Sequence, residues 1–285
     1  MSAVLSLASV PSFLSVVIDN CTFLDEPVQW EHIANRNNVQ SMNFEYCNWV
    51  GWCVLFPNLT KVSLSGIDAE KVDVLVQHCV NVRILELEVN EGTVTDACVD
   101  SMCRTWRFIS ELSFYWGGVR ERQIRKLVTS CPSLTSLFVT TFTSVHYTTS
   151  YPPNYTSHRL HTAYIDCDDG ETIRTLILHC PYLHALSLRS TGGESTVGEA
   201  LSCIPGSSVK CLGLDYEDLC DGDILLLQHA RLTQLCIGGA SQLIIQLVTT
   251  LPLLHTLKLE CCRDVDSARL LHVPSLCPTL RVFEF

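Results

Sequence analysis

The chain has 285 residues, of which 47% are hydrophobic and 17% are charged. This much apolar material supports a continuous core and excludes an intrinsically disordered protein. Lys and Arg number 19 against 30 Asp and Glu, which gives a formal net charge of -11, and there is no basic run. The composition therefore excludes nucleic-acid binding through phosphate contacts and favours a basic or neutral protein partner.

The first 18 residues, MSAVLSLASVPSFLSVVI, carry no charged side chain. A secretory signal peptide has a basic region before its apolar run, and this stretch lacks one. It fits instead as half of a sequence repeat in which apolar residues occupy the first, fourth and sixth positions. No other uncharged apolar run is long enough to cross a bilayer, so we expect no membrane association.

The same apolar spacing recurs twelve times along the chain. Its first position falls on Phe13, Val39, Leu59, Val82, Ile109, Leu134, Leu160, Leu183, Val209, Leu232, Leu254 and Leu280. The steps range from 20 to 27 residues, a period typical of leucine-rich repeats, each of which contributes a short strand and a returning segment. The sequence predicts an α/β leucine-rich-repeat solenoid, a horseshoe of about 12 repeats with a concave parallel sheet and convex helices or loops. Residues 1–285 are expected to form a single leucine-rich-repeat domain.

The segment before most strands is predicted to be an amphipathic helix that packs on the sheet. Pairs of apolar residues lie seven and six positions before the first repeat position, at Leu75/Val76, Met102/Cys103, Leu127/Val128, Leu176/Ile177, Leu225/Leu226 and Leu247/Val248. Proline recurs two residues before that position, for example at Pro132 and Pro181. It ends the helix because it lacks the backbone N–H that a helix needs.

Two parts of the chain depart from the repeat. The segment FTSVHYTTSYPPNYTSH, from Phe142 to His158, has no helical pattern and is expected to be a loop on the convex side. The chain begins with half a repeat and stops at Phe285, without a polar cap at either end. Because solenoids need capping repeats for solubility, we expect a longer protein or a partner that covers the ends.

Seven of the 16 cysteines fall at repeat positions that suit a small apolar residue or cysteine. Four of them, Cys79, Cys131, Cys180 and Cys277, lie three residues before the first repeat position. Other repeats have Val, Phe, Trp or Leu there, so the thiol acts as a small hydrophobe. This pattern predicts reduced cysteines in an intracellular protein of the cytoplasm or nucleus.

No metal, cofactor or catalytic site is predicted. Cysteine pairs such as Cys47 with Cys53, or Cys98 with Cys103, lack the CxxC or CxxH spacing of a structural zinc site. The sequence also has no G-x-S-x-G motif and no phosphate-binding loop. We therefore expect a binding protein and not an enzyme.

The concave face of the sheet is where a protein partner is expected to bind. Acidic residues recur six positions after the first repeat position, and aromatic residues gather in repeats 5 to 7. Aromatic side chains are enriched in the hot spots of interfaces. The predicted protein-binding residues are Glu86, Glu88, Glu111, Tyr115, Trp116, Phe138, Tyr164, Asp166, Asp215 and Glu260. The alternative is that these acidic residues are ordinary solvated charges at strand ends.

Four motifs carry a resemblance to a known family: HCVNVRILELEVN (78–90), TDACVDSMCRTWRFISELSF (95–114), SCPSLTSLFV (130–139) and HCPYLHALSL (179–188). They resemble the cysteine-containing leucine-rich repeats of F-box proteins, which are related to ribonuclease-inhibitor-like solenoids. The resemblance covers essentially the full length. It implies the substrate-recognition region of an F-box-type SCF ubiquitin ligase receptor, in which the repeats select a protein substrate and a separate F-box binds the adaptor of the cullin ligase.

Too few residues precede the first strand to form an F-box, so adaptor binding is expected only if an F-box lies outside this chain. Two other functions stay open. One is a leucine-rich-repeat scaffold or adaptor without a link to a ubiquitin ligase. The other is a leucine-rich-repeat inhibitor or regulator of an enzyme.

Overall fold

The computed structural model describes residues 15–19, 38–45, 56–91, 94–115, 119–140, 159–166, 170–189, 197–215, 221–238, 243–260 and 267–285. The contacts within the chain divide it into two compact units, Met1–Leu134 (unit 1) and Thr135–Phe285 (unit 2). We describe each unit by itself.

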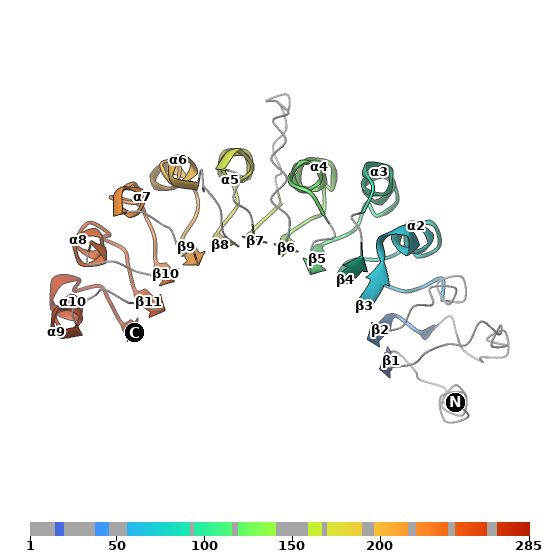
Figure 1. Ribbon diagram of the computed structural model, residues 1–285, viewed down its shortest axis with the longest axis horizontal. Coiled ribbons are helices and arrows are strands. Elements are labelled where there is room, and N and C mark those ends of the chain that lie inside the picture. Colours follow the sequence, from blue (N-terminus) through green and yellow to red (C-terminus); the bar gives the residue numbers. More distant parts are fainter. Residues whose placement is uncertain are drawn as a thin grey trace. The chain divides into compact units, whose positions relative to one another are not determined.

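In the described part of unit 1, two strands come first, and from the third strand onward each strand is followed by a helix. The elements are β1 (Ser15–Asp19), β2 (Ser41–Glu45), β3 (Lys61–Asp68), α2 (Ala69–His78), β4 (Ile84–Glu91), α3 (Asp96–Thr105), β5 (Glu111–Tyr115) and α4 (Glu121–Ser130). Each of the strands β1 to β5 pairs in parallel with the next one in sequence. The three helices lie on one side of the strands (Figure 1).

Unit 2 has the same alternation, and its described α-helices after α5 are shorter than those of unit 1. Its described elements are β6 (Ser136–Val139), β7 (Thr162–Asp166), α5 (Gly170–His179), β8 (Ala185–Arg189), α6 (Val197–Leu201), the 3₁₀ turn Ile204–Gly206, β9 (Cys211–Asp215), α7 (Asp221–Leu225), β10 (Gln234–Gly238), α8 (Ile244–Thr249), β11 (Thr256–Glu260), α9 (Ser267–Leu270), α10 (Val273–Leu276) and β12 (Val282–Glu284). The strands β6 to β12 also pair in parallel, each with the next in sequence. This architecture confirms the predicted α/β leucine-rich-repeat fold.

Each sheet is covered by helices on one face and open on the other. Parallel sheets are normally buried on both faces, but these strands alternate buried and partly exposed residues, as in β5 and β8. The buried side chains are the fourth and sixth positions of the sequence repeat, for example Leu85 and Leu87, which are both 0% exposed. We call the face that carries the alternate, partly exposed residues the open face.

The predicted core is confirmed in every repeat from the second to the eleventh, where the first, fourth and sixth positions are all buried. The last repeat differs, because Phe285 is 62% exposed. The helical prediction was wrong at one place. Leu226 is exposed, and the buried residues of that segment are Ile224 and Leu227, because α7 ends at Leu225 and the chain continues as a turn.

Hydrogen bonds tie each repeat to the next in the same way. The carbonyl oxygen of Thr60 accepts hydrogen bonds from the backbone N–H groups of both Arg83 and Ile84, at 2.8 and 3.0 Å. In unit 2 the carbonyl of His161 does the same for His184 and Ala185. Because these contacts fix where each strand begins, differences in repeat length fall in the connecting segments.

Candidate protein-binding surface

The register of the parallel strands places the open-face residues in straight rows across each sheet. In unit 1, Ser63 is paired with Glu86, and Glu88 lies between Ser65 and Tyr115. Side chains opposite each other on adjacent strands are close enough to interact. The pairing of residues across adjacent strands therefore determines which of the predicted residues lie side by side.

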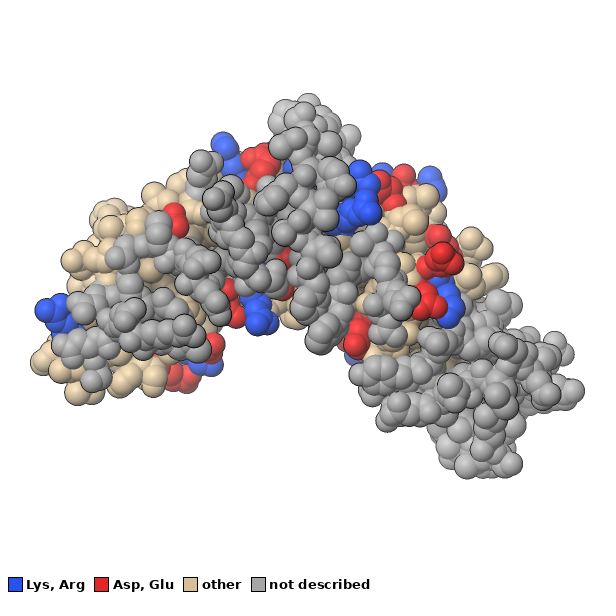
Figure 2. Space-filling model, in the orientation of Figure 1, with Lys and Arg blue, Asp and Glu red and all other residues tan. Residues whose placement is uncertain are grey.

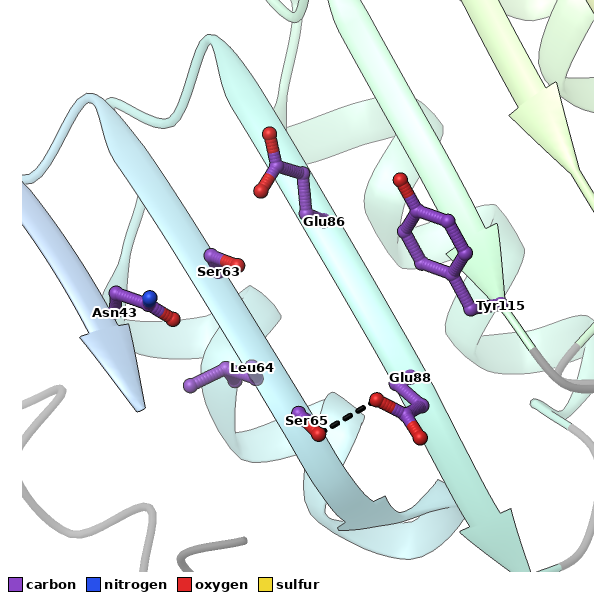
Figure 3. Close-up of a pocket in the computed structure, with 7 residues that line it drawn as sticks. All are labelled: Asn43, Ser63, Leu64, Ser65, Glu86, Glu88 and Tyr115. Carbon is purple, nitrogen blue, oxygen red and sulfur yellow. Dashed lines mark hydrogen bonds between the residues drawn. The ribbon is translucent and has the colours of Figure 1, made fainter. Parts of the chain in front are cut away.

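A hollow of about 290 Å³ lies on the open face of unit 1. It is lined by Asn43, Ser63, Leu64, Ser65, Glu86, Glu88 and Tyr115. Figure 3 shows the two carboxylates of β4 between the serines of β3 on one side and the phenol ring of Tyr115 on the other. Three of the ten predicted site residues, Glu86, Glu88 and Tyr115, thus come together, and Glu111 is exposed at the start of β5.

The two carboxylates in this hollow have different partners. Glu88 Oε2 accepts a hydrogen bond from the hydroxyl of Ser65 at 2.6 Å, drawn as the dashed line in Figure 3. Glu86 Oε1 lies 3.3 Å from the ammonium nitrogen of Lys61, whose side chain is 44% exposed. An exposed ion pair of this kind contributes about 0 to 1 kcal/mol, so a cationic group from a partner can compete with Lys61.

The open face of unit 2 carries an aromatic pair. The rings of Phe138 and Tyr164, on the paired strands β6 and β7, are stacked with centroids 4.3 Å apart and planes inclined by 11°. Both side chains are partly exposed. Stacked aromatic rings give a rigid apolar surface that loses little conformational entropy on binding, a property typical of interface hot spots.

Arg189 on β8 extends this aromatic pair with a positive charge. A hydrogen bond with the Tyr164 hydroxyl raises the pKa of Arg189, and the carboxylates of Asp215 and Asp166 raise it as well. The Arg189 Nε atom lies 3.3 Å from Asp215 Oδ2. Asp215 lies on β9, and its partner on β10 is Gly238. This glycine leaves room for the carboxylate, because a Cβ atom there would lie 2.7 Å from Asp215 Oδ1.

The structure changes the interpretation of the acidic residues in unit 2. Asp166 is only 5% exposed, so it is poorly placed for direct contact with a partner. Asp215 Oδ2 lies 3.3 Å from Arg189 Nε, and Glu260 Oε1 lies 2.9 Å from the Lys258 ammonium. Lys61, Arg189 and Lys258 are therefore basic neighbours of the predicted acidic residues that the predicted set left out.

The remaining predicted features lie outside the described residues. These are Trp116 and the segment from Phe142 to His158. On the visible surface in Figure 2, acidic and basic side chains lie next to each other at several places. This agrees with the ion pairs that connect neighbouring strands and helices.

The cysteines before the strands are buried free thiols. Cys79 and Cys180 are both 0% exposed, and burial raises the pKa of Cys180 to about 12. Within the described residues, no three His, Cys, Asp or Glu side chains gather as a metal site would require. In that same part of the chain, no helix is both long and apolar enough to span a bilayer.

The repeats, the one-sided parallel sheets and the helices define a leucine-rich-repeat protein. No protein-family model matches the chain, and no curated protein matches it. Solved structures do match. The leucine-rich-repeat protein LegL7 from Legionella pneumophila is 14% identical with a TM-score of 0.55, and the match covers 94% of this chain and 89% of LegL7.

Two further solved structures are longer than this chain. A chain of the TLR13–ssRNA13 complex is 15% identical with a TM-score of 0.53, and the match covers 98% of this chain and 37% of that one. A chain of the yeast Rad7–Elc1 complex is 14% identical with a TM-score of 0.49, over 86% of this chain and 63% of that one. At these identities the likeness establishes the fold alone, and the Rad7 likeness is too low to add to it.

Proposed function

We propose that this chain is a protein-binding leucine-rich-repeat module whose open face takes a basic protein partner. The observation that carries the proposal is the stacked pair Phe138 and Tyr164, two large aromatic side chains left partly exposed on a sheet face. Keeping aromatic rings in water costs free energy that a partner recovers when it covers them.

The chemistry of unit 1 supports a basic partner. The hollow beside β4 has two carboxylates, two serine hydroxyls and a phenol, which accept hydrogen bonds, and Tyr115 adds an aromatic wall. A guanidinium group can bind a carboxylate through two parallel hydrogen bonds and stack on an aromatic ring. The net charge of -11 attracts a basic protein over a longer range.

We further propose that the module is the substrate-recognition region of an F-box-type ubiquitin ligase receptor in the cytoplasm or nucleus. Its support is the recurring cysteine that precedes the strands, which is buried and free at Cys79, Cys131, Cys180 and Cys277. This is the position that the cysteine-containing repeats of F-box proteins share. In this role the open face holds the target protein while other subunits transfer ubiquitin.

The binding proposal is tested by affinity purification with the wild-type chain and with a Phe138→Ala, Tyr164→Ala double variant. Proteins captured by the wild type and lost by the double variant should be basic, and cross-links should map them to the open face of β6 to β8 in unit 2. Equal capture by both forms would refute the open face as the binding surface.

The ligase proposal needs a separate measurement on the natural gene product expressed in cells. Co-purification of a cullin-ligase adaptor, together with ubiquitination of the captured protein, supports it. If a protein is captured without the adaptor and is not ubiquitinated, the result would indicate a scaffold. Inhibition of a captured enzyme makes it a regulator.

A further inference from the structure

Two cysteines of unit 1 lie in contact on neighbouring repeats. Cys103 is in the last turn of α3, Cys131 directly follows α4, and their sulfur atoms are 3.8 Å apart with Cys131 as the donor. Cys131 fills the buried position before a strand, whereas Cys103 is partly exposed. The corresponding helix position holds Val76 in α2 and Val128 in α4, so packing alone does not require a thiol at position 103.

The surroundings of Cys103 favour its thiolate. The hydrogen bond from Cys131 is the main cause that lowers the pKa of Cys103, and the Lys126 ammonium lowers it further, against the opposing effects of burial and of the Asp100 carboxylate. Lys126 forms an ion pair with Asp100. The pKa of Cys131 is raised by its hydrogen bond to Cys103 and by burial. The pair thus places a thiol whose pKa is lowered beside one whose pKa is raised, and a lower pKa favours reaction as the thiolate.

We propose that Cys103 is a thiol-modification site at which a peroxide oxidises the sulfur and Cys131 resolves the product as a disulfide. The Cys103 thiolate attacks one peroxide oxygen, an S–O bond forms, the O–O bond breaks, and the released hydroxide takes a proton to become water. Cys131 then loses its proton and attacks the sulfur of Cys103, so that the S–S bond forms as the S–O bond breaks. The second hydroxide leaves as water, and the two thiols have given two electrons and two protons to one peroxide.

The movement required is small. The two sulfur atoms must approach from 3.8 Å to the disulfide length of about 2.05 Å. Cys103 lies two residues before the end of α3, where helices are easily rearranged because their ends fray. The bond joins residues 28 positions apart on adjacent repeats, so the oxidised unit should resist unfolding more than the reduced one.

The test uses the purified full chain, reduced and then treated with hydrogen peroxide at neutral pH. Trypsin cuts after Arg83, Arg104, Lys126 and Arg159, which places Cys103 with Cys98 in peptide 84–104 and leaves Cys131 as the single cysteine of peptide 127–159. After alkylation of the remaining thiols, mass spectrometry should find these two peptides cross-linked. The cross-link should disappear when the sample is treated with dithiothreitol.

Matched variants decide which thiol reacts. Cys98→Ser should keep the cross-link, because burial is the main cause that raises the pKa of Cys98, and Cys103→Ser should abolish it. In Cys131→Ser, the probe dimedone should label Cys103 as a sulfenic acid. Circular dichroism verifies that each variant folds.

The proposal is overturned if peroxide oxidises other cysteines of the folded wild type without producing the cross-link. It is also overturned if the cross-link persists in Cys103→Ser through Cys98. Lys126→Met gives an independent readout that needs no disulfide, since loss of the ammonium should slow alkylation of Cys103 by iodoacetamide. An unchanged rate would contradict the proposed activation.

Discussion

The two units share one scaffold and differ in what they display on it. In unit 1 the open face around β4 is a polar hollow with Glu86, Glu88 and Tyr115. In unit 2 it carries the stacked rings of Phe138 and Tyr164, with Arg189 beside them. The buried residues behind both faces follow the same spacing, so the repeat fixes the core and leaves the open face free to carry function.

The balance of charge also differs between the two faces. The acidic side chains Asp215 and Glu260 of unit 2 each have a basic neighbour within 3.3 Å or less. In unit 1, Glu86 likewise has Lys61 at 3.3 Å, but Glu88 accepts a hydrogen bond from the neutral hydroxyl of Ser65. We therefore expect unit 1 to respond mainly to charge and salt, and unit 2 to respond mainly to loss of aromatic surface.

The largest effect is expected on stability, from truncating the core leucines that the two units have in common. Leu85 in β4 and Leu137 in β6 occupy the same repeat position and are 0% and 1% exposed. Replacing either by alanine leaves a cavity and should lower the free energy of unfolding by about 2 to 5 kcal/mol. Urea unfolding followed by circular dichroism measures this loss.

Phe108→Ala is the control for that measurement, because Phe108 is 70% exposed and its loss should change stability by less than about 0.5 kcal/mol. A cost below about 1 kcal/mol for Leu137→Ala would mean that the strand register is wrong. A cost within about 2 to 5 kcal/mol for one leucine and below about 1 kcal/mol for the other would show that the units do not share one kind of core.

The core could be predicted from the sequence because burial in a repeat depends on local periodicity. A strand exposes every second residue, and each turn of the solenoid presents the same positions to the interior. The prediction failed at Leu226, six positions before Leu232, because a fixed offset assumes a regular helix. In that segment α7 ends at Leu225, and the turn that follows buries Leu227 instead.

The site was predicted less completely because its chemistry depends on contacts across strands. The sequence placed Glu88 and Tyr115 at the same repeat position and Glu86 two residues before Glu88 on the same strand face, and the structure brings all three to one hollow. The sequence did not show that Lys61 and Arg189 form ion pairs with carboxylates on the adjacent strand, because a periodic pattern does not say how far a side chain extends.

The second largest effect is expected on binding by unit 2. Phe138→Ala combined with Tyr164→Ala removes the stacked pair and should cost about 2 kcal/mol or more of binding free energy, the usual threshold of a hot spot. The melting temperature should change little, because both rings are partly exposed. Titration calorimetry with the captured partner and a thermal melt separate the two effects, and a large fall in melting temperature would assign the rings to the fold.

A smaller effect is expected on the pH dependence of stability, from the cysteine that fills the buried position before a strand in unit 2. Burial raises the pKa of Cys180 in unit 2 to about 12 from the usual 9.0. The unfolded chain therefore loses this proton above pH 9 while the folded chain keeps it, so stability is full below about pH 9 and falls as the pH rises toward 12. The slope from one such thiol is at most about 1.4 kcal/mol per pH unit.

Cys180→Ala should remove that part of the alkaline loss, even if the variant is less stable at neutral pH. The measurement is urea unfolding of both forms at pH 8 and pH 10. If wild type and variant lose the same stability between these pH values, the thiol ionises equally in both states and its burial has no energetic consequence.

The smallest effect is expected on the acidic hollow of unit 1. Glu88→Gln keeps the shape of the side chain and its capacity to accept from Ser65 but removes the charge, so binding of a basic partner should weaken by about 0.2 to 1 kcal/mol. The dependence of affinity on salt should become shallower as well, because exposed charges act through a screened field.

Glu260→Gln in unit 2 is the matched control, since Glu260 already has Lys258 as a neighbour at 2.9 Å and its loss should change affinity less. Affinities measured at low and high salt decide between the faces: a larger effect of Glu260→Gln would move the charge-sensitive surface from unit 1 to unit 2.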